Sequence, residues 1–316
     1  MFIDAPIQDI VELETFYLGI ISTETTRYND EVQSVDLDQV QTTVKAVVKA
    51  AGGRPVSYFG ARHWHYSEDA AIANAAFEAG ATSASTDIGA KTHGLEGTGT
   101  IPHALENVFA LYYGKENAVV QATLAFDKHI DPSIPRISLI DYNNKEIDDS
   151  VATAQALRGH LDAVRVDTCG ENVAQGVLPN LTGSESQIWR QQGLPLPSPD
   201  HPYAKYWAGT GVTISGVFAL RQALNQAGFE DVKIILTSGF GNPEKVKALV
   251  QAEELLGTKL FDALGVGGVY SPCRASTMDI VLAGETPDAM TPISKQGRSY
   301  HHNPDLKPQL IKNQGN

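Results

Sequence analysis

A glycine-rich run, Gly97–His103, ends in a histidine at the point where a helix is expected to begin. Its glycines allow a tight turn and a close approach to a ligand, and Pro102 suits the first turn of a helix. Backbone N–H groups and the helix dipole favour an anion at such an end. The run therefore predicts an anion site that includes His103, although a polar turn that only caps a helix fits it equally well.

Charged side chains follow several segments that have the pattern of strands. Arg62 comes after one such segment, and the planar guanidinium of arginine suits phosphate. Asp167 stands beside a hydroxyl at the end of another, which suits a ribose hydroxyl, a water-bridged magnesium ion or a simple turn cap. Arg165 alternates with two valines on that strand. An inward-facing arginine there needs an anionic partner.

Two glycine loops follow the last predicted strands. Ser238-Gly239 comes after one of them and Gly267-Gly268 after the next. Glycine loops in these positions bind phosphate through backbone N–H groups in α/β barrels. Each loop alone also fits an ordinary turn, but two in succession favour a phosphate site.

The elements that must position these residues alternate regularly. Helical patterns are expected near residues 38–51, 67–79, 102–112, 151–157, 217–227 and 243–256. Strand patterns cover residues 55–59, 82–85, 136–140, 163–166, 232–236 and 263–266. This alternation predicts a parallel α/β sheet, either open or closed into a barrel. Convergence of so many polar strand ends on one face favours the barrel.

Three segments stand outside this alternation. Residues 1–35 contain an apolar run at 16–21 without a clear strand partner. Residues 171–209 are expected to form a long irregular excursion, and the polar tail after Gly284 adds no βα unit.

Composition restricts the class of protein. The chain has 316 residues, with 42% hydrophobic and 19% charged residues, which is typical of a globular protein. A net charge of −13 argues against nucleic-acid and anionic-membrane partners. Two cysteines without a CxxC pair indicate neither a disulfide framework nor a cysteine zinc site. With no signal peptide or membrane-spanning run, we expect a cytoplasmic enzyme or binding protein.

Taken together, the motifs resemble the nicotinate phosphoribosyltransferase family. The matching stretches are Leu13-Glu14-Thr15, Leu18-Gly19, Phe59–Arg62, Gly97–His103, Val164–Thr168, Gly211–Thr213, Ser238-Gly239 and Gly265–Gly268. Their order and spacing agree with the family over roughly residues 10–270. The Lys295–Arg298 segment is loosely similar to the family's basic C-terminal segment.

The resemblance implies a fold and a domain organisation. It implies an irregular, seven-stranded parallel α/β barrel over residues 54–284, with a reduced N-terminal domain in residues 1–53. Residues 285–316 are expected to pack back toward that N-terminal part. A homodimer or higher homo-oligomer is implied, and a separate chain that supplies the rest of the N-terminal domain is an alternative.

The resemblance also implies an activity and roles for single residues. Transfer of a phosphoribosyl group from phosphoribosyl pyrophosphate to nicotinate would form nicotinate mononucleotide, with Mg²⁺ held mainly by pyrophosphate. His103 would be phosphorylated by ATP, Asp141 and Asp167 would meet ribose hydroxyls or magnesium, and Arg62 would bind phosphate. Phe59 would stack on the pyridine ring and Arg165 would face its carboxylate. The 5′-phosphate would lie at Ser238, Gly239, Gly267 and Gly268.

Two departures from the family pattern leave alternatives open. His63 replaces the usual second arginine, which predicts weaker or pH-dependent phosphate binding. Asp87 falls where nicotinamide-using relatives place an acid, so nicotinamide is an alternative substrate. Quinolinate is a third possible substrate, although this diacid needs more cationic residues around its ring than the sequence offers. A non-catalytic, nucleotide-binding paralogue is the alternative from a different class.

Overall fold

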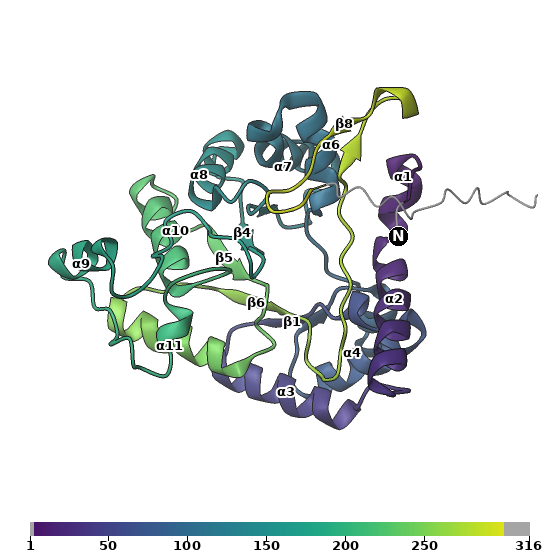
Figure 1. Ribbon diagram of the computed structural model, residues 1–316, viewed down its shortest axis with the longest axis horizontal. Helices are drawn as coiled ribbons and strands as arrows, with labels where there is room; N and C mark the ends of the chain where they lie inside the picture. The colour runs from purple at the N-terminus through teal and green to yellow at the C-terminus, as the bar shows by residue number, and fades with distance from the viewer. Residues whose placement is uncertain (1–2, 300–316) are drawn as a thin grey trace, which may run out of the picture.

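Strands and helices alternate along most of the chain, and the main strands join in one parallel sheet (Figure 1). The computed structural model describes residues 3–299. The strands of this sheet are β1 (Val56–Tyr58), β2 (Ser83–Ala84), β3 (Ile137–Leu139), β4 (Ala163–Val166), β5 (Lys233–Leu236) and β6 (Ala263–Val266). Their spatial order is β2-β1-β6-β5-β4-β3, and each neighbouring pair is parallel. The predicted parallel α/β class is confirmed.

Helices pack around the sheet and bury its apolar side chains. They are α1 (Ile7–Ile10), α2 (Glu14–Asp30), α3 (Leu37–Ala50), α4 (Asp69–Glu78), α5 (Asp87–Ala90), α6 (His103–Tyr113), α7 (Ala118–His129), α8 (Glu146–Leu157), α9 (Ser184–Gln191), α10 (Ile214–Gln226) and α11 (Pro243–Leu256). α3 contacts α4 and α11, and α8 contacts α7 and α10. Val40, Val44 and Val47 of α3 are fully buried at helical spacing, as predicted.

The glycine-rich run crosses between the two edge strands of the sheet. The Thr98 backbone N–H donates to the Ala84 carbonyl of β2 at 2.8 Å. Ile101 is buried in a small apolar cluster with Leu139 of β3. No regular strand forms in this run, which is rich in glycine and ends at Pro102, a residue that lacks the N–H needed for a ladder. Six strands of the sheet therefore lie within residues 3–299, and a seventh is not among them.

Helix ends and the predicted loop differ from expectation in detail. α3 begins after Asp36, whose side chain accepts from the Gln39 N–H, rather than after Asp38. Pro102 is the N-cap of α6 and not part of its first turn. The Asn242 cap and the Pro243 start of α11 are as predicted. The excursion at 171–209 contains the short helix α9, and α7 was not expected at all.

The N-terminal apolar run lies in helix α2, which packs against the turn after β1. The buried side of α2 consists of Leu18, Gly19, Ser22, Thr23 and Thr26. A Cβ on Gly19 would overlap the Trp64 carbonyl oxygen, so only glycine permits this close packing.

After β6 the chain runs along α2. Figure 1 shows this irregular segment in yellow-green beside the purple helix. Arg274 pairs with Asp30 of α2 at 2.6 Å, and the Ser276 N–H donates to the Ser22 hydroxyl at 2.9 Å. The short antiparallel pair β7 (Leu282–Ala283) and β8 (Thr291–Pro292) follows. Of the predicted tail 285–316, residues 300–316 lie outside the described residues.

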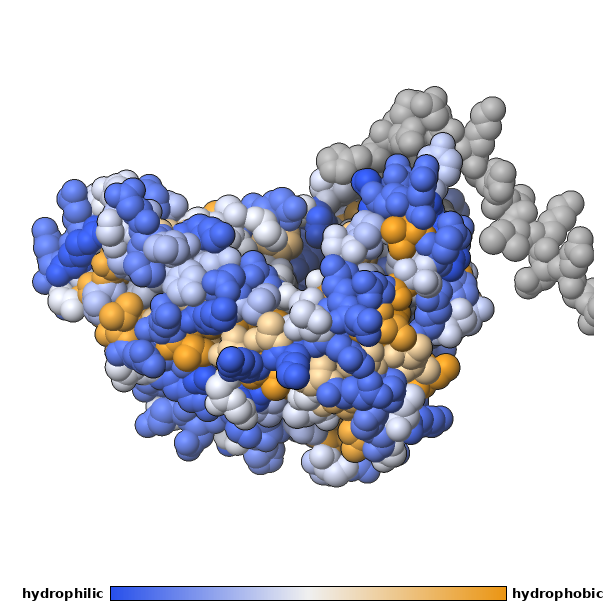
Figure 2. Space-filling model, turned by 90° about the horizontal axis from the view of Figure 1, so that it is seen from below, coloured by the Kyte–Doolittle hydropathy of each residue, from blue (hydrophilic) through white to orange (hydrophobic). Residues whose placement is uncertain are grey.

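The surface seen from below is mostly hydrophilic, with hydrophobic residues in separate patches (Figure 2). It is indented between the part that carries α9 and the part that carries the N-terminal helices. Across residues 3–299, no helix combines the length and the apolar character needed to span a membrane.

Asp149 of α8 is expected to destabilise the fold at neutral and higher pH. It is buried, and its Oδ2 atom has no hydrogen-bond partner in the described structure. Burial raises the pKa of Asp149 from 3.8 to about 7. The folded state therefore holds a proton that the unfolded chain has lost, and stability falls as pH rises between these values.

We expect Asp149→Asn to stabilise the protein at pH 8 by about 2–4 kcal/mol, with little change at pH 4. Urea unfolding at both pH values measures this difference. Asp148→Asn, at the exposed neighbouring position, is the matched control. Equal effects of the two substitutions at pH 8 would contradict the assignment.

Candidate active site

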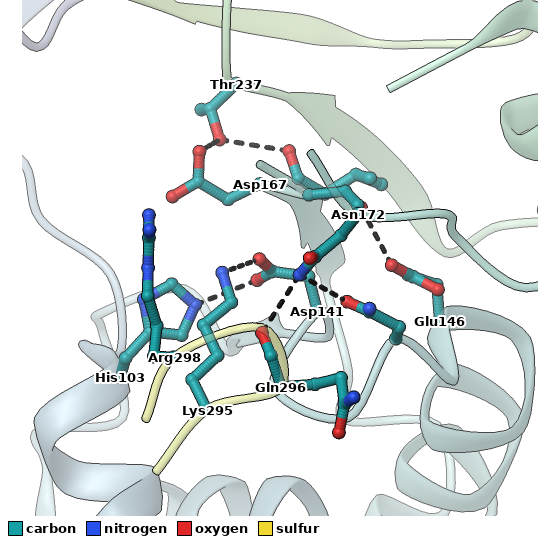
Figure 3. A network of polar contacts seen from close by, with 12 residues as sticks. His103, Asp141, Glu146, Asp167, Asn172, Thr237, Lys295, Gln296 and Arg298 are labelled. Atoms are coloured by element: carbon teal, nitrogen blue, oxygen red, sulfur yellow. Dashed lines mark hydrogen bonds and ion pairs between the residues drawn. The ribbon is translucent and has the colours of Figure 1, made fainter. Parts of the chain in front are cut away.

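The carboxyl ends of β3, β4 and β5 bring together polar side chains that are far apart in the sequence (Figure 3). Leu139 is in register with Arg165, and Val166 with Leu236. The residues that follow these strands therefore lie at one edge of the sheet, as predicted. Asp141 and Asp167 are both there, and so is Thr237, which the sequence did not single out.

His103 is held by a buried carboxylate. Its Nε2 atom lies 2.9 Å from Oδ1 of Asp141, which is fully buried. A carboxylate only accepts hydrogen bonds, so Nε2 carries a proton and donates a hydrogen bond to Asp141. In the neutral ring Nδ1 then keeps its lone pair, and His103 is also the first residue of α6. The pair thus leaves a nucleophilic nitrogen beside a helix N-terminus, which favours anions.

Lys295 binds the second oxygen of the same carboxylate. Its Nζ forms a close ion pair with Asp141 Oδ2, and the residue is 4% exposed. Burial alone would raise the pKa of Asp141, but His103 and then Lys295 lower it below its usual 3.8. Asp141 therefore stays ionised. Each of its oxygens has one partner, so Asp141 positions His103. Its predicted contact with ribose hydroxyls or magnesium stays a prediction.

The segment that carries Lys295 is fixed over the site by backbone contacts. The Gln296 N–H donates to the Tyr142 carbonyl at 2.8 Å, and its carbonyl accepts from Asn172 at 2.9 Å (Figure 3). The sequence indicates only a loose family resemblance for Lys295–Arg298. Its contact with Asp141 spans 154 positions of sequence, and no spacing rule predicts such a contact.

Glu106 adds a second buried carboxyl group one turn along α6 from His103. Both of its carboxyl oxygens lack a hydrogen-bond partner in the described structure. Burial, and next the negative charge of Asp141, raise the pKa of Glu106 well above its usual range. The pKa shifts of the two acids therefore have opposite directions, since that of Asp141 is lowered.

A second polar cluster lies at the ends of β4 and β5. Arg165 Nη1 lies 3.3 Å from Asp167 Oδ2, and the Thr237 hydroxyl donates to Asp167 Oδ1 at 2.7 Å. Arg165 thus has the anionic partner that an inward-facing arginine requires. Its Nε atom is buried and has no hydrogen-bond partner among the described residues.

Phe59 lies across the strand β6 at the same end of the sheet. A Cβ on Gly265 would come within 2.7 Å of the Phe59 ring and of the Thr237 methyl group. Glycine at this position therefore lets the Phe59 ring lie close to Thr237 of the second polar cluster. The ring is half-buried, and its predicted stacking on a pyridine ring stays a prediction.

Arg62 and His63 form the short turn that follows β1. The Arg62 side chain is exposed. The Gly268 N–H donates to His63 Nδ1 at 2.9 Å, and burial, then the Arg62 charge, lower the pKa of His63 to about 4. His63 is therefore neutral near pH 7 and supports the second glycine loop. The predicted pH-dependent phosphate binding through His63 does not fit this pKa at neutral pH, and the Gly268 N–H is already engaged.

The two glycine loops touch each other. A Cβ on Gly241 would come within 2.6 Å of the Gly267 carbonyl oxygen, so the loop after β5 packs directly on the loop after β6. Ser238 and Gly239 both have positive φ values, 70° and 82°. Their placement agrees with a phosphate site, and the individual roles of Ser238, Gly239, Gly267 and Gly268 stay predictions.

Asp87 lies at the end of β2, in the first turn of α5. It is exposed, and its Oδ1 accepts from the Gly97 N–H at 2.9 Å. This contact fixes the start of the glycine-rich run. It gives Asp87 a local structural task, and its part in choosing between nicotinate and nicotinamide stays a prediction.

Comparison with known proteins adds a relative. A nicotinate phosphoribosyltransferase of Mycobacterium tuberculosis is 28% identical over 292 residues, which cover 88% of this chain and 62% of the relative. This chain is similar to nicotinate phosphoribosyltransferases. It spans less than two thirds of the length of the curated relatives it matches. No model of a protein family matches the chain.

Solved structures extend the similarity to nicotinate phosphoribosyltransferases in three dimensions. The nicotinate-nucleotide pyrophosphorylase from Pyrococcus furiosus is 27% identical, with a TM-score of 0.52 over 84% of this chain and 54% of that one. The nicotinate phosphoribosyltransferase from Porphyromonas gingivalis has a TM-score of 0.58 over 92% of this chain and 67% of that one. At 15% identity the second match shows a shared fold alone.

Proposed function

We propose that this chain carries the catalytic site of a nicotinate phosphoribosyltransferase. The reaction moves the phosphoribosyl group of phosphoribosyl pyrophosphate to the ring nitrogen of nicotinate, releases pyrophosphate, and is driven by ATP hydrolysis. The observation that carries this proposal is His103, held through Nε2 by the buried Asp141–Lys295 pair. The alignment with the Mycobacterium relative supports it.

The phosphorylation step uses the free nitrogen of His103. Nδ1 attacks the γ-phosphorus of ATP, the bond to the bridging oxygen breaks, and ADP leaves. The Nε2 proton stays on the ring, where ionised Asp141 stabilises the positive charge that develops. Water later hydrolyses the N–P bond and releases phosphate.

The transfer step relies on positioning, because its transition state resembles an oxocarbenium ion and needs little covalent help. Nicotinate stacks on Phe59, and its carboxylate faces the guanidinium of Arg165, which lies at the end of β4 beside Asp167. The C1′–O bond to pyrophosphate breaks as the pyridine nitrogen bonds to C1′. The Asp167 carboxylate accepts a hydrogen bond from a ribose hydroxyl, and the hydrogen bond from the Thr237 hydroxyl orients Asp167.

Magnesium fits this site as a partner of the substrate. Asp167 is partly exposed and offers one carboxylate ligand. Mg²⁺ prefers oxygen ligands and keeps several waters, with phosphates supplying the rest. The described residues contain no group of three or more histidine, cysteine or acidic side chains arranged for a metal ion.

The proposal extends to architecture and assembly. In the proposed architecture, an irregular barrel over residues 54–284, the Gly97–Ile101 run takes the place of a seventh strand. Its hydrogen bond to β2 and the contact of Ile101 with Leu139 of β3 support this. Residues 1–53 form the proposed remnant of an N-terminal domain with its linking helix, toward which the 285–316 tail packs. A homo-oligomer in the cytoplasm is the proposed state, and a separate chain completing the N-terminal domain is its variant.

The test is direct synthesis. Purified protein is incubated with phosphoribosyl pyrophosphate, Mg²⁺ and nicotinate, with and without ATP, and products are separated by chromatography. We expect nicotinate mononucleotide, formed faster with ATP. Parallel reactions contain nicotinamide or quinolinate in place of nicotinate. No mononucleotide from nicotinate under either condition would refute the proposal.

A further inference from the structure

Lys245 of α11 folds back onto the glycine loop that follows β5. Its Nζ donates to the Ser238 carbonyl at 3.1 Å and lies 4.4 Å from the centre of the Phe240 ring. A Cβ on Gly239 would come within 3.6 Å of the same nitrogen. The ammonium group therefore lies directly against Ser238-Gly239.

This ammonium group has no acidic partner. Within residues 3–299 no carboxylate forms an ion pair with Lys245, since its neighbour Glu244 pairs with Lys247 at 2.6 Å. Lys245 is half-buried, and burial lowers its pKa to about 8. An ammonium has three donors, and the structure uses one of them on a protein oxygen. A desolvated charge of this kind is costly unless a ligand compensates it.

The surroundings of Lys245 suit an anion. The loop at Ser238-Gly239 has left-handed backbone conformation at two consecutive residues and packs on the loop at Gly267-Gly268. α11 has 14 residues and begins at Pro243, so its positive end also faces this region. Lys245 thus contacts the loop at Ser238-Gly239, which in turn contacts the loop at Gly267-Gly268.

We propose that Lys245 is a further phosphate-binding residue, which binds a phosphomonoester dianion together with the Ser238-Gly239 loop. Within the proposed function, on which this identity of the ligand rests, that dianion is the 5′-phosphate of the ribose. Lys245 neutralises one of its charges, and the backbone fixes the orientation of the oxygens.

The test measures binding of ribose 5-phosphate by calorimetry, with ribose as the ligand that lacks phosphate. We expect Lys245→Met to weaken binding by about ten- to hundredfold, the effect typical of a lost hydrogen bond to a charged group. Lys247→Met is the matched control, because Lys247 lies on the same helix, is exposed and pairs with Glu244. Circular dichroism verifies that both variants are folded.

A second measurement separates ligand binding from a purely structural role. A lysine whose pKa is about 8 reacts readily with acetic anhydride near neutral pH. We expect ribose 5-phosphate, but not ribose, to reduce acetylation of Lys245 severalfold in peptide mass spectra, while acetylation of Lys247 stays constant. Unchanged acetylation of Lys245 would overturn the proposal, as would equal affinity of Lys245→Met and the native chain.

These experiments need neither nicotinate nor ATP. Failure of mononucleotide synthesis with intact, Lys245-dependent binding would refute the proposed function alone. Synthesis by a Lys245→Met variant that binds ribose 5-phosphate normally would refute the role of Lys245 alone.

Discussion

Replacement of His103 by alanine is expected to abolish stimulation by ATP while a slow, ATP-independent transfer persists. Among residues 3–299, only His103 joins a free ring nitrogen to the buried Asp141–Lys295 pair, so its loss removes the proposed nucleophile for ATP. The groups proposed to bind ribose and nicotinate are unchanged by this substitution. The measurement is the rate of nicotinate mononucleotide formation with and without ATP, and in the variant the two rates should become equal.

His129→Ala is the control for His103→Ala, because His129 is exposed at the end of α7. It should retain full stimulation. Acid-labile labelling by ATP carrying ³²P in the γ position gives an independent readout and should disappear in His103→Ala alone. ATP stimulation that survives in His103→Ala would show that the phosphohistidine role is wrong.

Asp141→Ala is expected to destabilise the fold by about 3–5 kcal/mol, because it leaves the ammonium of Lys295 buried without its partner. The double variant Asp141→Ala/Lys295→Met removes both charges and should recover much of that loss. Neither variant should couple transfer to ATP, since His103 is no longer oriented. Urea unfolding and the ATP-stimulation assay measure the two effects separately.

The pH dependence of this cluster has a definite sign. His103 and Lys295 outweigh burial and hold the pKa of Asp141 below its ordinary 3.8. The stabilisation is therefore complete above that value and is lost as pH falls below it.

Substitution of the exposed Asp200 by alanine is the control for Asp141→Ala and should leave stability unchanged. A double variant as unstable as Asp141→Ala would contradict the role of Lys295.

The sequence predicted those parts of the site that follow strands. Asp141, Asp167 and Arg165 lie at or just after strand patterns, and parallel strands bring their carboxyl ends together whatever the spatial order of the strands. That order was not predictable, because hydrophobic patterns identify strands but not their neighbours. Lys295 was missed as a site residue because its contact with Asp141 spans 154 positions of sequence, and no local pattern indicates so distant a partner.

Helix α2 shows a different limit of hydrophobic patterning. Its buried positions have regular helical spacing, but three of the five are serine or threonine and one is glycine. A buried side made of small polar residues gives almost no amphipathic signal. The apolar run at 16–21 therefore stood out without revealing which side of the helix packs.

Lys295 follows all six strands of the parallel sheet in the sequence. A chain made from its N-terminus onward has therefore exposed every strand to folding before this lysine leaves the ribosome. Asp141 and His103 can meet at that stage, but the ammonium that completes the buried ion pair arrives last. The residue that fixes the charge of the proposed phosphorylation site thus completes that site only after all six strands have been made.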